Sequence, residues 1–266
     1  MCIRDRNNSN LKNNQTGSVY VFINNKDNTF SMSPHEDLIE LGIITDSAIL
    51  DINKDGNEDL IITGEWMITT VVINNSGKLE VSTNDYAFNQ QKGLWNNILI
   101  DDFNNDGQDD LLIGNIGNNS TISPSHRIYT GDYDNNGSQE QILCEVINGE
   151  VYPIVDFDLL RSQVPSIKKK VIYHRDYAQS TMQDLFGSDI IKKSDVLTLD
   201  ETETSLYLST ESGYHRMALP EEIQYSSVHT AAVMDVNQDG NKDILLGGNH
   251  FLIPVSYTHL TLPTKA

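Results

Sequence analysis

The chain has 266 residues and a formal net charge of −20, with 38 acidic and 18 basic residues. Such an excess of carboxylates argues against nucleic acid and anionic membranes as partners, because both are bound through clustered lysine and arginine. No run of about 18 apolar residues occurs, so no membrane-spanning helix is predicted. The two cysteines, Cys2 and Cys144, provide no disulfide framework, and Cys144 is expected to be a buried, inert thiol.

Both ends of the chain differ in character from the rest. Residues 1–6 (MCIRDR) and 256–266 (SYTHLTLPTKA) resemble translated sequencing-adapter tails, so we exclude them from fold reasoning as non-native. We expect residues 7–255 to be a fragment of a longer chain.

Short β-type segments follow one another from residue 18 onward. Residues 18–23 (SVYVFI) predict a strand that turns through an Asn-Asn pair, and residues 71–73 repeat this pattern before a second such turn. Further strands are predicted at 47–50, 60–63, 97–100, 111–113, 206–208 and 244–246. Glycines at 64, 114 and 247 close three of them, as suits a crowded backbone turn.

Loops rich in Asp and Asn join several of these strands. In the first loop Asp51, Asn53 and Asp55 alternate, Gly56 follows, and Asp59 comes just before an apolar run. Ca²⁺ takes about six to eight oxygen ligands, and a backbone that tracks round the ion offers one side chain at every second residue. Glycine permits the sharp turn, so that the residues at positions 7 and 9 can complete the ligand shell.

The same pattern occurs four times, and we number the loops 1 to 4 in chain order. The predicted calcium ligands at positions 1, 3, 5, 7 and 9 are Asp51, Asn53, Asp55, Asn57 and Asp59 in loop 1; Asp102, Asn104, Asp106, Gln108 and Asp110 in loop 2; Asp132, Asp134, Asn136, Ser138 and Glu140 in loop 3; and Asp235, Asn237, Asp239, Asn241 and Asp243 in loop 4. Loop 3 departs from the pattern because Glu140 replaces aspartate at position 9 and Gln141 begins the next strand. The sequence therefore predicts three or four structural calcium sites.

Two other structures share features of this loop, the EF-hand and the metal-free Asp-Gly turn. An EF-hand needs a bidentate Glu at position 12 and flanking helices, but Ile62, Ile113, Leu143 and Leu246 stand there. Asp-Gly turns also occur in hairpins that bind no metal. Four metal-free copies would each hold carboxylates that repel one another, which favours the calcium interpretation.

Two landmarks give one repeat length. Asn24 and Asn74 are 50 residues apart, and Asp51 and Asp102 are 51 apart. A period near 50 with about four short strands is typical of a propeller blade. We therefore predict an all-β fold, a partial β-propeller of four-stranded blades, interrupted by an insert at about residues 116–200. The insert is expected to hold a β-hairpin region and one helix, at about residues 175–186 with Gly187 as its stop.

The D-x-N-x-D-G-x-x-D loops, each leading into an apolar triplet and glycine, resemble FG-GAP and VCBS repeats, which build calcium-binding β-propellers such as the head of integrin α chains. The order of repeat, insert and final repeat is more narrowly similar to bacterial cell-surface VCBS-repeat proteins related to the ASPIC/UnbV group. The resemblance implies that the ions are structural and that surface loops bind the ligand.

The expected function is therefore an extracellular or cell-surface module that binds a protein or polysaccharide. The alternative is a carbohydrate-active enzyme, a polysaccharide lyase or hydrolase, on the same scaffold. No nucleophile elbow, phosphate loop or zinc pattern is present. The run His174-Arg175-Asp176 is interpreted as a solvated helix face, the histidines at 126, 215 and 229 as surface or cleft positions, and Trp66 and Trp95 as core. No catalytic residue is predicted.

Overall fold

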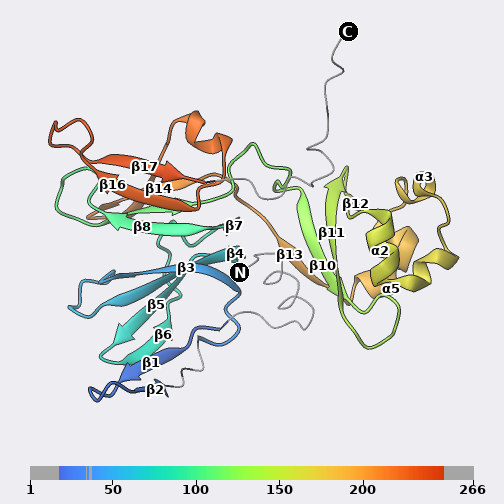
Figure 1. The fold of residues 1–266 in the computed structure, drawn as a ribbon, viewed down its shortest axis with the longest axis horizontal. Helices are drawn as coiled ribbons and strands as arrows, with labels where there is room; N and C mark the ends of the chain where they lie inside the picture. The colour runs from blue at the N-terminus through green and yellow to red at the C-terminus, as the bar shows by residue number, and fades with distance from the viewer. Residues whose placement is uncertain (1–17, 34, 36–37, 249–266) are drawn as a thin grey trace, which may run out of the picture.

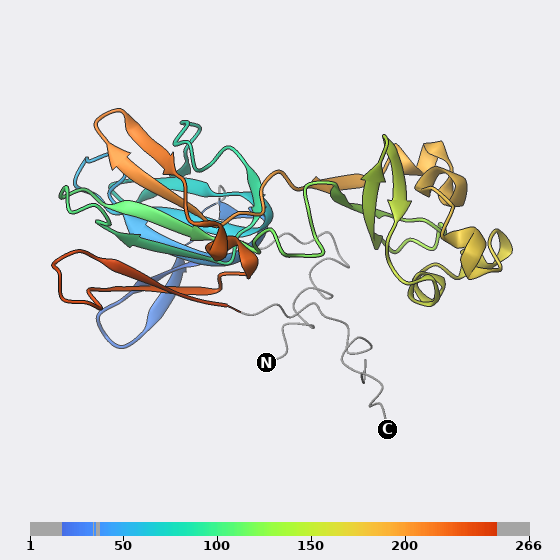
Figure 2. The same cartoon turned by 90° about the horizontal axis from the view of Figure 1, so that it is seen from above.

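The computed structural model describes residues 18–33, 35 and 38–248, so the tails expected at 1–6 and 256–266 lie outside the described residues. Most of the described chain forms antiparallel sheets that lie side by side in chain order (Figure 1). We call this part, residues 21–114 and 205–247, the fan. A second, smaller part, which we call the insert lobe, lies beside the fan and contains residues 126–198 (Figure 2). The predicted all-β fold is confirmed, with a few short helices in addition.

Two sheets form the first half of the fan. A hairpin of β1 (Val21–Asn24) and β2 (Phe30–Ser33) precedes a meander of β3 (Ile43–Leu50), β4 (Asp59–Ile68), β5 (Thr70–Asn75) and β6 (Lys78–Val81). The far end of β4 also pairs with β7 (Lys92–Leu94). The sequence predicts a unit that begins with the Asn-Asn hairpin and ends with the two strands flanking a loop. In the second sheet the order is the reverse: the two strands flanking loop 1 come first and the hairpin with the Asn-Asn turn comes last. The difference arises because β4 and β5 are joined through Thr69 alone, which makes them neighbours in one sheet.

The third sheet carries the insert. Its order is β15-β14-β9-β8, built from β8 (Asn97–Asp101), β9 (Asp110–Gly114), β14 (Ser205–Thr210) and β15 (Gly213–Met217). The chain leaves this sheet after β9 and returns at β14, so the insert interrupts one sheet between its second and third strands. A 3-10 helix, η3 (Glu221–Tyr225), leads to the last hairpin, β16 (Thr230–Met234) and β17 (Asp243–Gly247).

The insert is a four-stranded sheet with helices on one face. Its strands are β10 (His126–Gly131), β11 (Glu140–Ile147), β12 (Glu150–Pro153) and β13 (Asp195–Thr198), in the order β12-β11-β10-β13. The short helices are α2 (Phe157–Gln163), η2 (Pro165–Lys169), α3 (His174–Tyr177), α4 (Met182–Phe186) and α5 (Ser188–Ile191). The first three strands repeat the strand-loop-strand-turn order of the fan, but the fourth pairs on the opposite edge. The insert therefore contains more strands and helices than the predicted hairpin region and single helix.

The single helix predicted at 175–186 is wrong, although its glycine stop is correct. Thr181 and Asp184 form a reciprocal capping box, which starts α4 afresh after α3 has ended. Gly187 follows α4 with φ 84°, a left-handed conformation that suits glycine.

Apolar clusters hold the sheets together. Ile61 and Val71 of the second sheet pack with Trp95, Leu111 and Ile113 beside the third. The insert has its own core, in which Ile142 and Cys144 of β11 meet Phe157, Leu160 and other side chains of the helices. A smaller cluster joins the lobes, with Trp66 and Leu94 from the fan and Leu199 from the returning chain.

Gly114, the last residue of β9, lies at a crowded point of the backbone. A Cβ at this position would lie 2.0 Å from Asn97 Oδ1 and 2.6 Å from the Val228 carbonyl oxygen. The expectation that the glycines closing these strands occupy crowded points is therefore met at Gly114.

Replacement of Gly114 by alanine is expected to destabilise the fan by roughly 2–3 kcal/mol, because the added methyl group forces backbone apart. Urea denaturation measures the loss. Gly77→Ala is the control: Gly77 has φ 100° with open space around it, so only the backbone penalty of about 1 kcal/mol applies. Equal losses in the two variants would contradict the crowding argument.

Candidate functional site: the aspartate-rich loops

The four loops share one backbone conformation. In each, position 4 is a non-glycine residue in the left-handed region, namely Lys54, Asn105, Asn135 and Gln238, with φ of 59–61°. Position 6 is a glycine with φ of 85–89°. Two left-handed residues two positions apart curl the chain tightly, and loop 3 keeps this geometry despite its divergent sequence.

The carboxylate at position 1 holds the curl in place. In loop 1, Asp51 Oδ1 accepts from the Asp55 backbone N–H at 3.0 Å and Oδ2 accepts from the Gly56 N–H at 2.9 Å. The same pair of bonds is made by Asp102, Asp132 and Asp235. Three of the four loops add an amide at position 3, and in loop 1 Asn53 Nδ2 donates to Asp55 Oδ2 at 2.9 Å.

The carboxylate at position 9 joins each loop to its sheet. Asp59 Oδ2 accepts from the Ile52 N–H at 3.1 Å, and the residues at position 9 of the other loops make the same bond. The second oxygen of Asp59 accepts from the Asn74 N–H at 2.8 Å, and that of Asp110 from the Ser209 N–H at 2.7 Å. Both of these aspartates are buried. Loops 1 and 2 are thereby fixed to the third strand of their sheets, β5 and β14.

Local electrostatics differ between position 5 and position 9. The Asn57 backbone N–H holds the pKa of Asp55 below its usual range, and the Asn241 N–H does the same for Asp239. Burial raises the pKa of Asp110 in the absence of a metal ion. A bound cation would favour the ionised form of this buried carboxyl, so an ion in loop 2 would offset the cost of burying Asp110.

Loop 3 gathers carboxylates most closely. Asp132, Asp134 and Glu140 each place a carboxylate oxygen within 4.8 Å of the other two, which no other trio of histidine, cysteine or acidic residues does in the described part of the chain. Asp134 Oδ1 is shielded from solvent and has no hydrogen-bond partner among the described residues. Burial, together with the charges of Asp134 and Asp132, raises the pKa of Glu140. Three carboxylates this close together fit a hard cation such as Ca²⁺.

Loops 1, 2 and 4 lie along one edge of the fan, away from the insert lobe, whereas loop 3 lies within that lobe (Figure 1). Side chains connect the neighbours along the edge. Lys54 Nζ of loop 1 donates to Gln108 Oε1 of loop 2 at 3.1 Å, and Lys242 of loop 4 pairs with Asp101 beside loop 2. The predicted ligands of these three loops thus share one surface.

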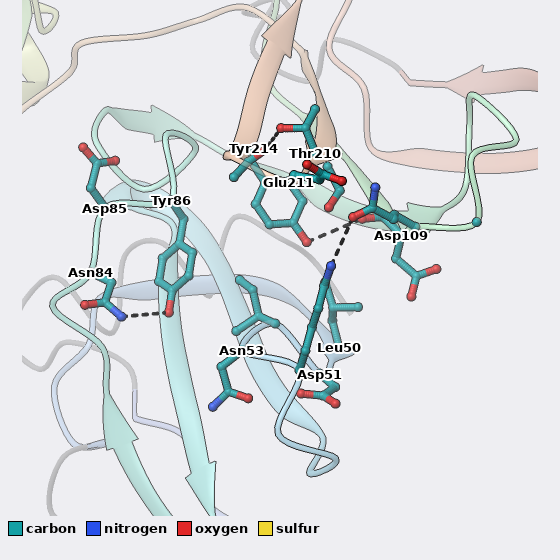
Figure 3. A pocket seen from close by; sticks show the side chains of 16 residues that line it. Leu50, Asp51, Asn53, Asn84, Asp85, Tyr86, Asp109, Thr210, Glu211 and Tyr214 are labelled. Carbon is teal, nitrogen blue, oxygen red and sulfur yellow. Dashed lines mark hydrogen bonds between the residues drawn. The ribbon is translucent and has the colours of Figure 1, made fainter.

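A pocket opens between loops 1 and 2 (Figure 3). Its volume is about 750 Å³, and its walls include Tyr86 and Tyr214 as well as Asp85, Asp109 and Glu211. Tyr214 donates a long hydrogen bond of 3.5 Å to the Asp109 carbonyl, and burial raises its pKa to about 12. This pocket could not be predicted from the sequence, because its walls come from four segments that are far apart in the chain.

The histidines, tryptophans and cysteine described below lie outside the four loops, on the surface or in the core, and none of them lines the pocket of Figure 3. His174, Arg175 and Asp176 are exposed on α3, as expected, and Trp66 and Trp95 are buried. His126 differs from the expectation because it is buried, and its Nδ1 lies 3.0 Å from the Ser123 backbone nitrogen in a local turn. Cys144 is fully buried, and burial raises the pKa of its thiol to about 12, which makes it unreactive.

Successive antiparallel sheets, four of which carry the same Asp-rich loop between two of their strands, define a protein built from β repeats. Residues 51–113, from loop 1 to the end of the strand after loop 2, match the family model of the FG-GAP-like repeat. Over these residues the match supports the resemblance to FG-GAP/VCBS repeats that the sequence predicts. No curated protein matches the chain. Within the described residues, none of the helices is long and apolar enough to cross a bilayer.

Proposed function

We propose that the chain is a calcium-stabilised repeat module that binds a ligand outside the cell or on its surface. The observation that carries this proposal is the recurrence of one loop conformation, with carboxylates at positions 1 and 9 in fixed places, in loops of different sequence. FG-GAP-like repeats suggest a module for ligand binding or adhesion. The stack of sheets also supports a partial β-propeller, and the narrower relation to bacterial VCBS-repeat proteins of the ASPIC/UnbV group belongs to the same proposal.

The role proposed for the ion is structural. Residues at positions 1, 3, 5, 7 and 9 would hold it, where it neutralises carboxylates that otherwise repel one another. Extracellular modules with such oxygen sites bind Ca²⁺ with dissociation constants near 10⁻⁴–10⁻³ M, roughly the calcium concentration outside cells. This range of affinities supports the proposed extracellular location. The ligand would be a protein or a polysaccharide, bound by surfaces that the rigid loops support.

Calcium titration of the whole chain by calorimetry tests the proposal. We expect three or four binding events, and Asp51→Asn should remove one of them because it takes a carboxylate from position 1 of loop 1. Glu58→Gln is the matched control, since it removes the same charge from position 8, which is exposed and faces no predicted ion. Absence of calcium binding, or equal losses in both variants, would contradict the proposed sites.

A further inference from the structure

A second cavity, of about 700 Å³, lies in the insert lobe. Its walls come from loop 3, from the strand β11 that follows it, and from helix α2. It is separate from the pocket of Figure 3, which lies between loops 1 and 2 of the fan. The cavity therefore belongs to the part of the chain that interrupts the repeats.

Side-chain amides dominate the polar part of the wall. Gln139 approaches from loop 3, Gln141 from β11 and Gln163 from α2. The Oε1 atoms of Gln139 and Gln163 are both shielded from solvent, and neither has a hydrogen-bond donor among the described residues. A buried acceptor without a donor is destabilising, so folding alone does not account for these two amides.

The unpaired amides are able to serve a ligand. The terminal torsion of a glutamine is broad and roughly two-fold, so each amide can turn its oxygen or its NH₂ group toward the cavity. An amide offers both a donor and an acceptor, which is the complement of a hydroxyl group. Two such amides, one from loop 3 and one from α2, line the same cavity and suit a ligand that carries several hydroxyl groups.

The remaining wall limits the charge of the ligand. Leu143, Val155 and Leu159 provide apolar surface, and Glu140 is the one ionisable residue among the described residues that line the cavity. The Glu140 carboxylate already accepts from the Tyr133 backbone N–H at 3.1 Å within loop 3. Lysine and arginine are missing from this wall, so nothing there would pair with an anionic ligand.

From these observations we infer that the insert lobe binds a neutral saccharide in this cavity, with Gln139 and Gln163 hydrogen-bonded to its hydroxyl groups and the leucines packed on its C–H surface. The inference rests on the ligand-binding role proposed above and gives it a site and a ligand class. Asn136, Ser138 and Glu140 belong both to loop 3 and to the wall. Calcium in loop 3 therefore shapes the cavity, and saccharide binding depends on calcium.

The test measures binding of neutral gluco-, manno- and galacto-oligosaccharides to the whole chain by calorimetry and saturation-transfer NMR, in excess calcium. Uronic-acid oligosaccharides and an unrelated neutral peptide serve as comparators. We expect at least one neutral oligosaccharide to bind, and Gln139→Leu combined with Gln163→Leu to weaken it at least tenfold. Gln183→Leu is the matched control, because Gln183 is an exposed glutamine on α4 of the same lobe outside the cavity.

Stability distinguishes a binding role from a structural one. Gln163→Leu removes an unpaired buried oxygen, so we expect its melting temperature to equal or exceed that of the original chain while saccharide affinity falls. A drop in melting temperature with affinity retained would overturn the inference. So would binding of the uronic-acid series or the peptide alone, or no saccharide binding in a protein whose calcium sites calorimetry shows to be filled. That last result would leave the calcium proposal intact, and equal saccharide affinity after chelation would overturn the coupling to loop 3.

Discussion

Chelation of calcium is expected to lower the melting temperature of the chain by roughly 5–10 °C for each loop that loses its ion. This applies in roughly 10 mM calcium, which is about 100 times a dissociation constant of 10⁻⁴ M. At that ratio an ion adds about 2.7 kcal/mol of stability, and 1 kcal/mol shifts the midpoint of a domain of this size by roughly 2–4 °C. The effect is large because the ion neutralises carboxylates whose burial and mutual repulsion otherwise destabilise the folded state. Asp59 and Asp110 are buried carboxylates, and each loop places further acidic groups close by.

Scanning calorimetry with calcium, and again after EGTA in the presence of magnesium, measures this shift. Magnesium is a suitable comparator because it requires near-octahedral geometry and keeps much of its water, so it does not replace calcium in such loops. The insert lobe and the fan have separate cores and one shared cluster, so two transitions can appear. An unchanged profile after chelation would mean that the hydrogen bonds of the loops suffice without an ion.

Replacement of Asn115 by alanine is expected to destabilise the protein by about 4 kcal/mol, the second large effect. Asn115 is fully buried at the point where the chain leaves β9 for the insert. Its Oδ1 accepts from the N–H groups of Leu94 and Ile116, at 3.2 Å and 2.8 Å, and its Nδ2 donates to the Glu201 carbonyl at 3.1 Å. Alanine takes these partners from the buried Leu94 N–H and from the part-buried Ile116 N–H and Glu201 carbonyl, at roughly 1–3 kcal/mol each and least for the part-buried groups.

Urea denaturation followed by tryptophan fluorescence measures this loss, since Trp95 is buried in the core between the second and third sheets. Asn119→Ala is the control. Asn119 is exposed four residues further on and makes one weak contact, Nδ2 to the Tyr225 carbonyl at 3.4 Å, so a loss below about 0.5 kcal/mol is expected. A similar small loss for Asn115→Ala would show that water or neighbouring groups replace its bonds.

The strands beside the loops could be predicted because their signals are local. Loop 1 ends in Asp59 and passes directly into apolar residues, and the same order marks β9 and β17. The loop conformation likewise follows from residues within nine positions of one another. The site positions were therefore available from the sequence, although their occupancy by calcium stays a prediction.

The insert could not be predicted in the same way, because its contacts are distant in the chain. Val196 of β13 pairs with Tyr129 of β10, and nothing in either segment identifies the other. The helix predicted over 175–186 failed because apolar spacing outweighed the cap at Thr181. The cavity of the insert lobe could not be predicted because Gln139 and Gln163 line it together only after α2 has folded onto the sheet.

The two ends of the insert meet at one place. The Asn115 N–H donates to Thr204 Oγ1 at 3.1 Å, and the Gly117 N–H donates to the Thr202 carbonyl at 2.8 Å. In the preceding sheet the equivalent strands, β4 and β5, are joined through a single threonine. We therefore expect a short linker in place of the lobe to leave the four-stranded sheet β15-β14-β9-β8 intact, and the same junction to accept a foreign domain whose termini lie equally close together.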